Sequence, residues 1–489
     1  APVLMIGGRA VPGERTDSLG EFWRFDADGL EPDTSYTLSL SDAGGGPLCD
    51  RWQLSTFPSP GDAPRHLRVL FFTGAGGHDL HINWRGTGPL PLEHRIRLLN
   101  RALEFEPDAV VSSGDQIYYD LRHGRTSKYL GGSAKSRIYA GAFDRSKPVL
   151  GTENEEVLKK AAGPQIANLF GVALRGVPTF FILDDHDYFE NDEARPEREF
   201  KILDLLWGWR TPFVRAGTSF PPDDFMLDLG RSAQKLYLPE FLPDLNRPPD
   251  LPGSGAPDRA PGVSETYGTL RYGNLAEILL YESRRFITLD GPNALFIPRQ
   301  VENWLIERMH AEETAHVVHA PATIFGLSAG KWLEWYSDVR DESGRLTADK
   351  EKYMWQAGWF FQHNRLLRAA SDMRSSIPLF ICGDLHSQAE GSISRSGKTN
   401  LDDNPVRFVA SGSLGTGALG FPSGIRGMVA EPPSALDVDL GLPATEKNGF
   451  VIADFTPDRV TMRFFSWRPP EPPDEIDTLE PHHVLELRR

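Results

Sequence analysis

The sequence has few cysteines, no long apolar run and fewer basic than acidic residues, and each shortage excludes a class of protein. Only Cys49 and Cys382 are present, which excludes a disulfide framework and a zinc site built from several thiolates. No stretch approaches the roughly 18 apolar residues that a membrane-spanning helix needs. Lysine and arginine number 52 against 68 aspartates and glutamates, a formal charge of −16. We therefore expect no membrane span and no nucleic-acid backbone as the main partner.

The beginning of the chain has the pattern of a small all-β domain. Residues 29–40 contain a turn followed by a strand with alternating polar and apolar side chains. Their Gly-Leu-x-Pro-x-Thr-x-Tyr pattern resembles the corner of a fibronectin-like sandwich. Residues 56–64 are rich in proline and glycine, as a linker is. We expect a small β domain over residues 1–60 and one larger domain over residues 65–489.

The larger domain has the alternation of an α/β fold. Apolar, β-prone runs alternate with segments whose apolar residues recur at helical spacing, which predicts a parallel or mixed sheet flanked by helices. The late strands favour a second sheet packed face to face with the first. Strands are expected at 69–72, 109–112, 179–183, 276–281, 378–382, 407–410, 449–455 and 460–466, and helices at 92–103, 300–309 and 364–373.

Two stretches of the larger domain are predicted to be irregular. Residues 243–263 contain three proline pairs or Pro-Gly pairs and are interpreted as a surface insertion. The chain from Pro469 begins with a proline-rich run and is interpreted as a solvated tail, with the His482-His483 pair exposed to solvent. We expect neither stretch to contribute to a functional site.

Three strands end in acidic and histidine residues. Residues 110–115, 180–187 and 379–386 each begin with an apolar run and end in carboxylates, and two of them include a histidine. This layout is expected when strands of one sheet bring metal ligands to a shared edge. Oxygen and imidazole ligands suit Zn, Mn, Fe or Ca. Paired metals of this kind activate water for attack on phosphorus.

Within the first two segments, Asp115 and Asp185 are the candidate metal ligands. A carboxylate such as Asp115, just after a strand and a glycine, can hold two cations together; the alternative is an Asp that opens a surface turn. The four consecutive titratable residues 184–187 would be costly after a buried strand unless cations or water compensate them. The alternative there is an exposed acidic loop. His186 is the candidate for stabilising the transition state or protonating the leaving group.

In the third segment, Asp384 and His386 are the candidate ligands. Residues two apart in an extended chain point the same way, so both are expected to face one metal site. A hydrogen-bonded core histidine is the alternative for His386. Asp120, which follows the first segment, is more often a solvated loop residue.

Taken in order, the three motifs resemble the alkaline phosphatase D-like (PhoD-like) metallophosphoesterases. The family pattern Gly-Asp-x-Ile-Tyr is present at 114–118, Asp-Asp-His-Asp followed by Asn at 184–187 and Asn191, and Gly-Asp-x-His-Ser at 383–387. Arg284 is a weaker match. The resemblance implies a two-sheet metallophosphoesterase (calcineurin-like) sandwich with a metal centre at the strand ends. It also implies hydrolysis of phosphate mono- or diesters.

The resemblance also implies roles for individual residues. Asp115 would bridge the metals, and Asp185, Asp384 and His386 would be ligands. His186 would lie beside the substrate phosphate. Tyr118 and Asn191 match motif positions and are candidates for substrate binding.

The chain departs from the family pattern at its first motif. The first strand of the family usually ends in Ser-Cys, with the cysteine as an iron ligand, whereas residues 69–81 contain no cysteine. Asp79 and His81, in a glycine-rich loop, have the Asp-x-His form and are candidate replacement ligands; a flexible loop with incidental charge is the alternative. Glu282 replaces the usual Asp before Arg284. Aromatic residues around 332–359 are candidates for the walls of a pocket, or for core.

We interpret the chain as a metal-dependent hydrolase of a small-molecule phosphate ester that uses metal-bound hydroxide and two metal ions (Fe, Zn, Mn or Ca). The alternatives are a phosphotriesterase with an aromatic pocket, a mononuclear metalloesterase acting on carboxylic esters, and a degenerate family member that binds without turnover. The sequence begins at Ala1 without methionine, which would fit removal of a signal peptide and a periplasmic or secreted protein, or simple trimming. It does not determine metal identity or oligomeric state.

Overall fold

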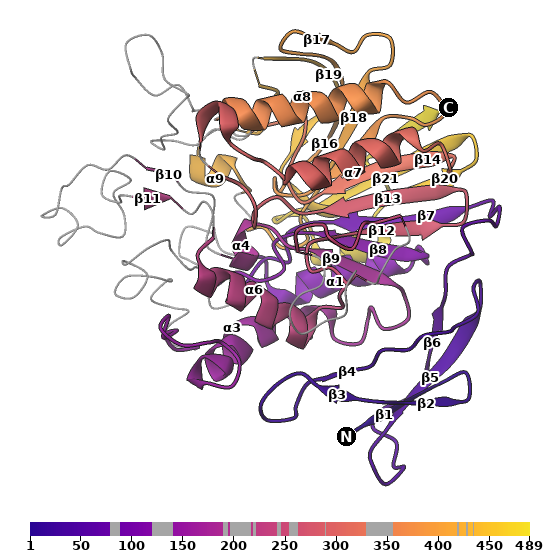
Figure 1. The fold of residues 1–489 in the computed structure, drawn as a ribbon, viewed down its shortest axis with the longest axis vertical. Coiled ribbons are helices and arrows are strands. Elements are labelled where there is room, and N and C mark those ends of the chain that lie inside the picture. Colours follow the sequence, from indigo (N-terminus) through magenta and orange to yellow (C-terminus); the bar gives the residue numbers. More distant parts are fainter. Residues whose placement is uncertain are drawn as a thin grey trace, which may run out of the picture.

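In the part of the chain that the structure describes, two β-sheets pack face to face, with helices on their outer faces and a small all-β unit at the N-terminus (Figure 1). The computed structural model describes residues 1–78, 89–119, 140–188, 194–195, 217–218, 222–241, 246–253, 263–288, 290–328, 356–417, 420–426, 429–433 and 435–489. None of the helices in these ranges has the length and apolar character needed to cross a membrane.

The first sheet has six strands in the order β22-β21-β20-β7-β8-β9. Its β7, β8 and β9 are parallel, with Phe72 opposite Ser112 and Ser113 opposite Ile182. The three C-terminal strands add to β7 in antiparallel fashion. The bounds are β7 (Leu67–Phe72), β8 (Ala109–Ser113), β9 (Thr179–Ile182), β20 (Asn448–Thr456), β21 (Arg459–Trp467) and β22 (His483–Arg488).

The second sheet runs β12-β13-β14-β15-β18-β16-β17, with β19 also paired to β16. Its central strands β13, β14, β15 and β18 are parallel. The bounds are β12 (Tyr267–Tyr272), β13 (Ala276–Tyr281), β14 (His316–Pro321), β15 (Leu379–Cys382), β16 (Gln388–Ser396), β17 (Thr399–Asn400), β18 (Val406–Ser411) and β19 (Leu436–Thr445).

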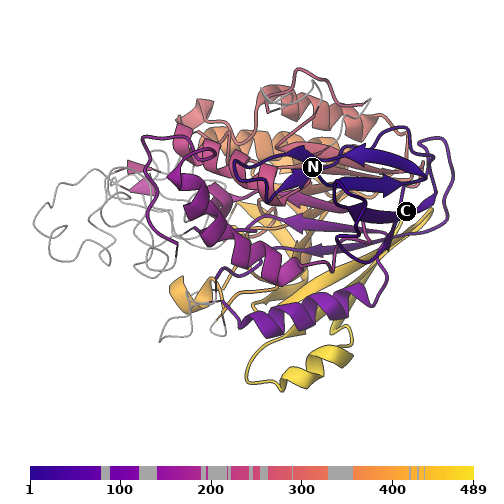
Figure 2. The same ribbon diagram turned by 90° about the horizontal axis from the view of Figure 1, so that it is seen from below.

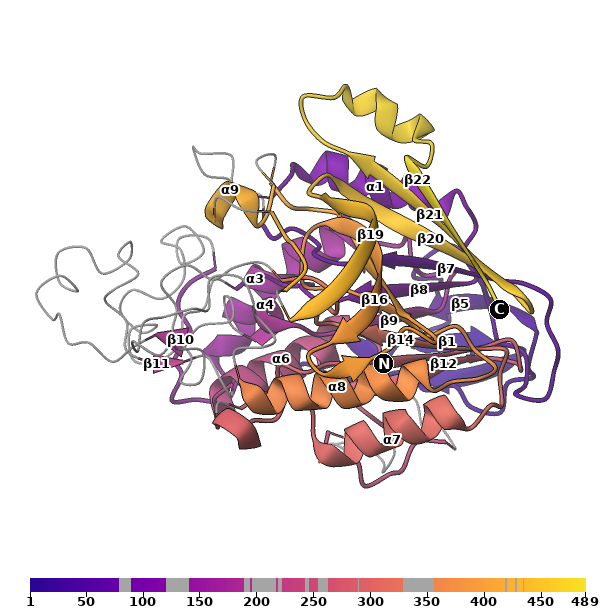
Figure 3. The same ribbon diagram turned by 90° about the horizontal axis from the view of Figure 1, so that it is seen from above.

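Alternate residues of β7 show how the two layers form. Val69 and Phe71 lie in the apolar core between the sheets, whereas Leu70 and Phe72 lie in the cluster that the helices cover. Successive strand side chains point to opposite faces, so a strand buried on both faces is apolar throughout. Helices α1 (Leu92–Leu103), α3 (Glu153–Phe170) and α6 (Asp224–Tyr237) lie on the side of the first sheet, and α7 (Arg299–His310) and α8 (Ala357–Ser371) on that of the second (Figure 3).

The N-terminal unit is all-β, as expected. It has a four-stranded antiparallel sheet, β2-β1-β5-β6, and a two-stranded β3-β4 pair around Leu4, Ile6 and Leu38. Lys159 on α3 makes ion pairs with Asp17 and Glu21 of this unit, and Figure 2 shows the unit against the larger domain. The bounds are β1 (Val3–Ile6), β2 (Arg9–Pro12), β3 (Glu14–Arg15), β4 (Trp23–Arg24), β5 (Ser35–Ser41) and β6 (Trp52–Ser55).

Two predictions about the C-terminal part are wrong. Strands β20 and β21 join the first sheet beside β7 rather than the second sheet. The end of the predicted tail is ordered, because η5 (Pro473–Thr478) contacts α1 and β22 pairs with β21. His482 Nε2 lies 2.9 Å from Gln388 Oε1 and His483 Nε2 lies 3.2 Å from Glu390 Oε1, so both histidines are hydrogen-bonded, although His482 is exposed to solvent as predicted. The 243–263 insertion lies mostly outside the described residues.

Candidate metal centre

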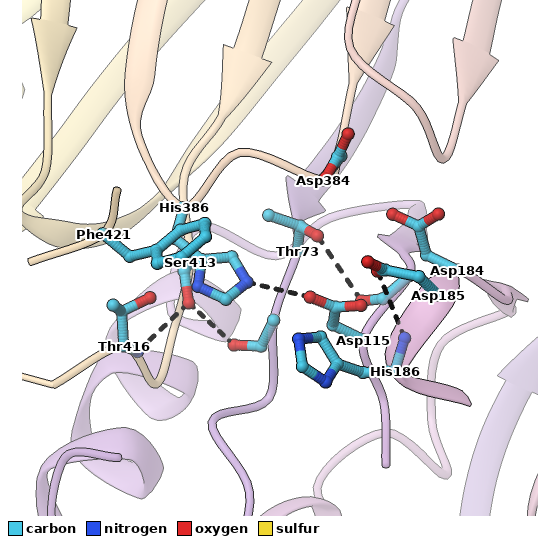
Figure 4. Close-up of polar contacts among 12 residues, drawn as sticks. Thr73, Asp115, Asp184, Asp185, His186, Asp384, His386, Ser413, Thr416 and Phe421 are labelled. Carbon is cyan, nitrogen blue, oxygen red and sulfur yellow. Dashed lines mark hydrogen bonds and ion pairs between the residues drawn. The ribbon is translucent and has the colours of Figure 1, made fainter. Parts of the chain in front are cut away.

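The carboxyl ends of the parallel strands meet at one edge of the two sheets, and the predicted acidic segments converge there (Figure 4). Ligand atoms of Asp115, Asp185 and His186 lie within 4.8 Å of one another. Those of Asp184, Asp185 and Asp384 do so as well, and Asp185 is common to both groups. Asp115 follows β8, residues 184–186 follow β9 and Asp384 follows β15. The convergence that the sequence predicted is therefore observed.

Around Asp115, an imidazole and a phenol share one carboxylate oxygen. His386 Nε2 lies 2.9 Å from Asp115 Oδ2, and the Tyr118 hydroxyl donates to the same oxygen at 3.0 Å. Tyr118 also packs its ring against His186, with centroids 4.2 Å apart. Among the described residues, buried Asp115 Oδ1 and His186 Nδ1 have no hydrogen-bond partner. Since buried polar atoms are rarely left without a partner, these lone pairs fit a bound cation.

The second group consists of carboxylates held by an arginine. Arg284 Nε donates to Asp184 Oδ1, and its NH2 group donates to Asp384 Oδ2 at 2.9 Å. The remaining oxygen of Asp184, Oδ2, is buried without a hydrogen-bond partner among the described residues. The sequence motifs predict Asp185, and not Asp184, as the ligand, and Arg284 is only a weak match to the family pattern. An isolated arginine after a strand gives no signal of a contact that depends on two other strands.

Backbone turns at the strand ends place these side chains. Gly114 has φ 89°, and a Cβ on it would lie 2.4 Å from Asp184 Cβ, so only glycine fits there. Asp115 and Asp384 have φ 59° and 66°, in the left-handed region that aspartate tolerates better than most residues. The expectation that the chain stays extended after β15 is therefore wrong. Asp384 joins the Asp184 group, while His386 joins Asp115.

The Asp187 carboxylate connects the loops that follow β8 and β9, and it does not belong to either group of candidate ligands. Its Oδ2 accepts from the backbone N–H of Asp115 at 3.0 Å and of Asp184 at 2.9 Å, and its Oδ1 accepts from that of Ile117 at 2.9 Å. One buried carboxylate thereby ties the loop after β8 to the loop after β9. The acidic run 184–187 thus divides into centre-facing residues and one structural anchor.

Gly74, two residues after the end of β7, lies beside His386 and carries no side chain. A Cβ on Gly74 would lie 3.0 Å from His386 Nε2 and 2.7 Å from Ser413 Oγ, so the existing neighbours fill the space that a side chain would take. The other predicted members, Asp79, His81 and Asn191, lie outside the described residues. Buried Arg95 donates to the carbonyl oxygens of Ala75 and Gly77, which fixes the start of the loop after Gly74.

The candidate centre contains more buried carboxylates than positively charged side chains among the described residues. Asp115, Asp184, Asp185, Asp187 and Asp384 are each at most 6% exposed, and Arg284 is the cation paired with them among the described residues. Burial, together with the Asp185 and Asp384 carboxylates, raises the pKa of Asp115 to about 7 against the opposing effects of His186 and Tyr118. Burial likewise raises the pKa of Asp184 well above its ordinary value. Bound cations would favour the ionised forms, so this donor set fits metal ions.

A pair of residues behind the centre ties α4 (Asp185–Tyr188) to the second sheet. The Tyr188 hydroxyl donates to Glu282 Oε1 at 2.9 Å and Oε2 at 3.0 Å. Burial raises the pKa of Glu282 to about 8. Glu282, which stands where the family pattern has aspartate, is therefore hydrogen-bonded to Tyr188. The sequence pattern did not predict a role for Tyr188.

Two other sequence features do not form a second site in the described part of the chain. Trp359, a candidate pocket wall, is 2% exposed and donates to the Thr288 carbonyl oxygen, so it belongs to the core. Residues 326–330 have the Gly-x-Ser-x-Gly form of a serine-hydrolase elbow. Ser328 is 1% exposed, however, and its backbone pairs with that of Glu431. A nucleophile needs an exposed hydroxyl, so this serine does not fit that role.

Comparison with solved structures identifies proteins with a similar fold. No protein-family model and no curated protein matches the chain. The solved structure described as PhoD matches 100% of this chain and 83% of its own at 15% sequence identity, with a TM-score of 0.57. Purple acid phosphatase PPD1 from yellow lupin (Lupinus luteus) seeds matches 100% of this chain and 69% of its own at 12% identity, with a TM-score of 0.52. The chain therefore has the PhoD-like metallophosphoesterase fold that its three motifs predicted.

Proposed function

We propose that this protein hydrolyses small-molecule phosphate esters with two metal ions held at the strand ends. The observation that carries the proposal is the pair of overlapping ligand groups that share Asp185. A shared carboxylate is what two neighbouring cations require. The fold is one that PhoD and a purple acid phosphatase also have.

The residues present fit such a centre. Asp115, Asp185, His386 and the Tyr118 hydroxyl would hold one cation, and Asp184, Asp185 and Asp384 the other. Two bound cations supply a hydroxide nucleophile at neutral pH and neutralise charge on the phosphoryl oxygens. Oxygen and nitrogen ligands suit Zn, Mn, Fe or Ca. The Tyr118 hydroxyl donates a hydrogen bond to Asp115 Oδ2, which keeps the carboxylate oriented.

His186 would protonate the leaving group. It begins α4 beside Asp185, its ring is held by Tyr118, and its buried Nδ1 has no hydrogen-bond partner among the described residues. A proton delivered to a departing alkoxide matters most when the alcohol is a poor leaving group. General acid catalysis of this kind contributes about 10²–10⁴-fold.

We expect His186→Asn to reduce kcat by about 100-fold for an alkyl phosphate ester and by less than about 10-fold for a nitrophenyl ester. The reason is that nitrophenolate departs without a proton. The two substrates are compared by steady-state kinetics, and metal content is measured on the same samples. Equal losses for both substrates, or loss of metal, would show that His186 is a ligand rather than an acid.

The proposed function is tested by elemental analysis of the purified protein and by mono- and diester hydrolysis before and after chelation. We expect about two metal ions per chain, in line with two-metal sites. Chelation should abolish turnover, and adding back Mn²⁺ or Zn²⁺ should restore it. Turnover that survives complete removal of metal would contradict the mechanism.

The missing ligand at Gly74 favours a second candidate, a family member that binds a ligand without turnover. Gly74 lies beside His386 and offers no side-chain ligand, so one cation would be held too weakly for catalysis. One metal per chain and no hydrolysis after reconstitution would support this candidate. One metal with hydrolysis of carboxylic esters would support a mononuclear metalloesterase.

A further inference from the structure

Arg284 is placed among the candidate ligands themselves. It is 1% exposed and follows β13 by three residues. Two of its hydrogen bonds reach both sheets, since Asp184 follows β9 of the first sheet and Asp384 follows β15 of the second. The guanidinium thus joins the two carboxylates across the seam where the sheets meet.

The group formed by Asp184, Asp185 and Asp384 has an unusual charge for a metal site, because a cationic side chain lies within it. Asp184, Asp185 and Asp384 bring ligand oxygens within 4.8 Å of one another, and three buried carboxylates so close repel each other strongly. Guanidinium carries a permanent positive charge and presents several donors in a fixed plane. Three ionised carboxylates and the Arg284 guanidinium together carry a net charge of −2.

We propose that Arg284 is a built-in cation of the metal centre, which sets the charge of the Asp184–Asp185–Asp384 position to match one divalent ion. It is a positioning residue: it holds one oxygen each of Asp184 and Asp384, and leaves Asp184 Oδ2 for the metal. Two consequences follow. The ligands stay in place when no metal is bound, and the position discriminates against trivalent ions. The inference rests on the metal centre of the proposed function, but not on the ester chemistry.

The test compares Arg284→Gln with Arg284→Lys and Arg285→Gln. Lysine keeps the charge. Arg285 is the matched control, because it is adjacent but bonds to Glu265 instead of the centre. Thermal unfolding of the full chain is measured after chelation and again with Mn²⁺. We expect the rise in Tm caused by Mn²⁺ to be at least about 3 °C larger in Arg284→Gln than in the wild type, because the cation replaces the lost charge. Arg284→Lys and Arg285→Gln should show the wild-type rise.

Selectivity gives a second readout. We expect the ratio of Tb³⁺ to Mn²⁺ affinity, from luminescence and competition titrations, to increase at least tenfold in Arg284→Gln, since the position then carries three negative charges. Asp184→Asn keeps the arginine and removes a carboxylate, so its Mn²⁺-induced rise should be smaller than that of the wild type. General structural damage would not move the two variants in opposite directions. If Arg284→Gln does not fold, the Mn²⁺-induced rises in Tm of Asp184→Asn and Arg284→Lys still test the inference.

The outcomes separate the inference from the proposed function. If Arg284→Gln loses the same stability with and without Mn²⁺, as a purely structural arginine would, and the Tb³⁺ to Mn²⁺ ratio is unchanged, the inference is overturned. If wild-type protein neither binds Mn²⁺ nor gains stability from it, the metal centre is absent and the proposed function fails with it.

Discussion

Asp115→Asn is expected to reduce phosphate-ester hydrolysis by at least about 1,000-fold, the order of magnitude for removing one preorganised charged group from an active site. Asp115 is 2% exposed, shares an oxygen with His386 and Tyr118, and has its second oxygen directed into the ligand group. An asparagine would keep the shape but remove the negative charge that the neighbouring cation needs. Steady-state kinetics and elemental analysis on the same preparation measure the effect, and we expect metal content to fall as well.

Asp403→Asn is the matched control for this substitution. Asp403 is exposed in the loop before β18, so the same change of charge should leave hydrolysis within about twofold, as surface substitutions usually do. An Asp115→Asn enzyme with wild-type activity and two bound metals would show that Asp115 is not a ligand that the centre needs. Loss of activity with full metal content would place Asp115 in the chemistry and not in metal retention.

Asp187→Ala is expected to lower the free energy of unfolding by about 3–5 kcal/mol. Three backbone N–H groups, those of Asp115, Ile117 and Asp184, donate to its buried carboxylate. Each buried donor left without a partner costs about 1–3 kcal/mol, and water entering the space would recover part of this. Equilibrium denaturation of the full chain measures the loss. Metal binding should weaken too, because Asp115 and Asp184 lose their anchor.

The control for this prediction is Asp42→Ala. The Asp42 carboxylate also accepts two backbone N–H groups, from Gly44 and Gly46, each at 2.8 Å, but it is exposed. Water can replace it there, so we expect a loss below about 1 kcal/mol. Equal losses for the two variants would mean that burial of the Asp187 hydrogen bonds is not what stabilises the centre.

Much of the fold could be predicted because its strands are buried on both faces. The runs at 69–72, 109–112 and 276–281 are mostly apolar and lie in the observed strands β7, β8 and β13. Helices α3 and α6 were not predicted. In α3 the central Gly163-Pro164 pair interrupts the helical pattern, and tertiary packing overrides that local preference.

That acidic residues and histidines follow three buried strands can be predicted from the sequence alone, because the polar residues that follow a strand lie at the edge of the sheet. The sequence thereby predicted the fold and the convergence of Asp115, Asp185 and Asp384. How these residues divide into two groups depends on the packing of the two sheets. The left-handed turns at Asp115 and Asp384, the anchor at Asp187 and the guanidinium of Arg284 depend on contacts between residues that are 72 to 271 positions apart in sequence. Local patterns carry no information about such contacts, since they arise only when both sheets have packed.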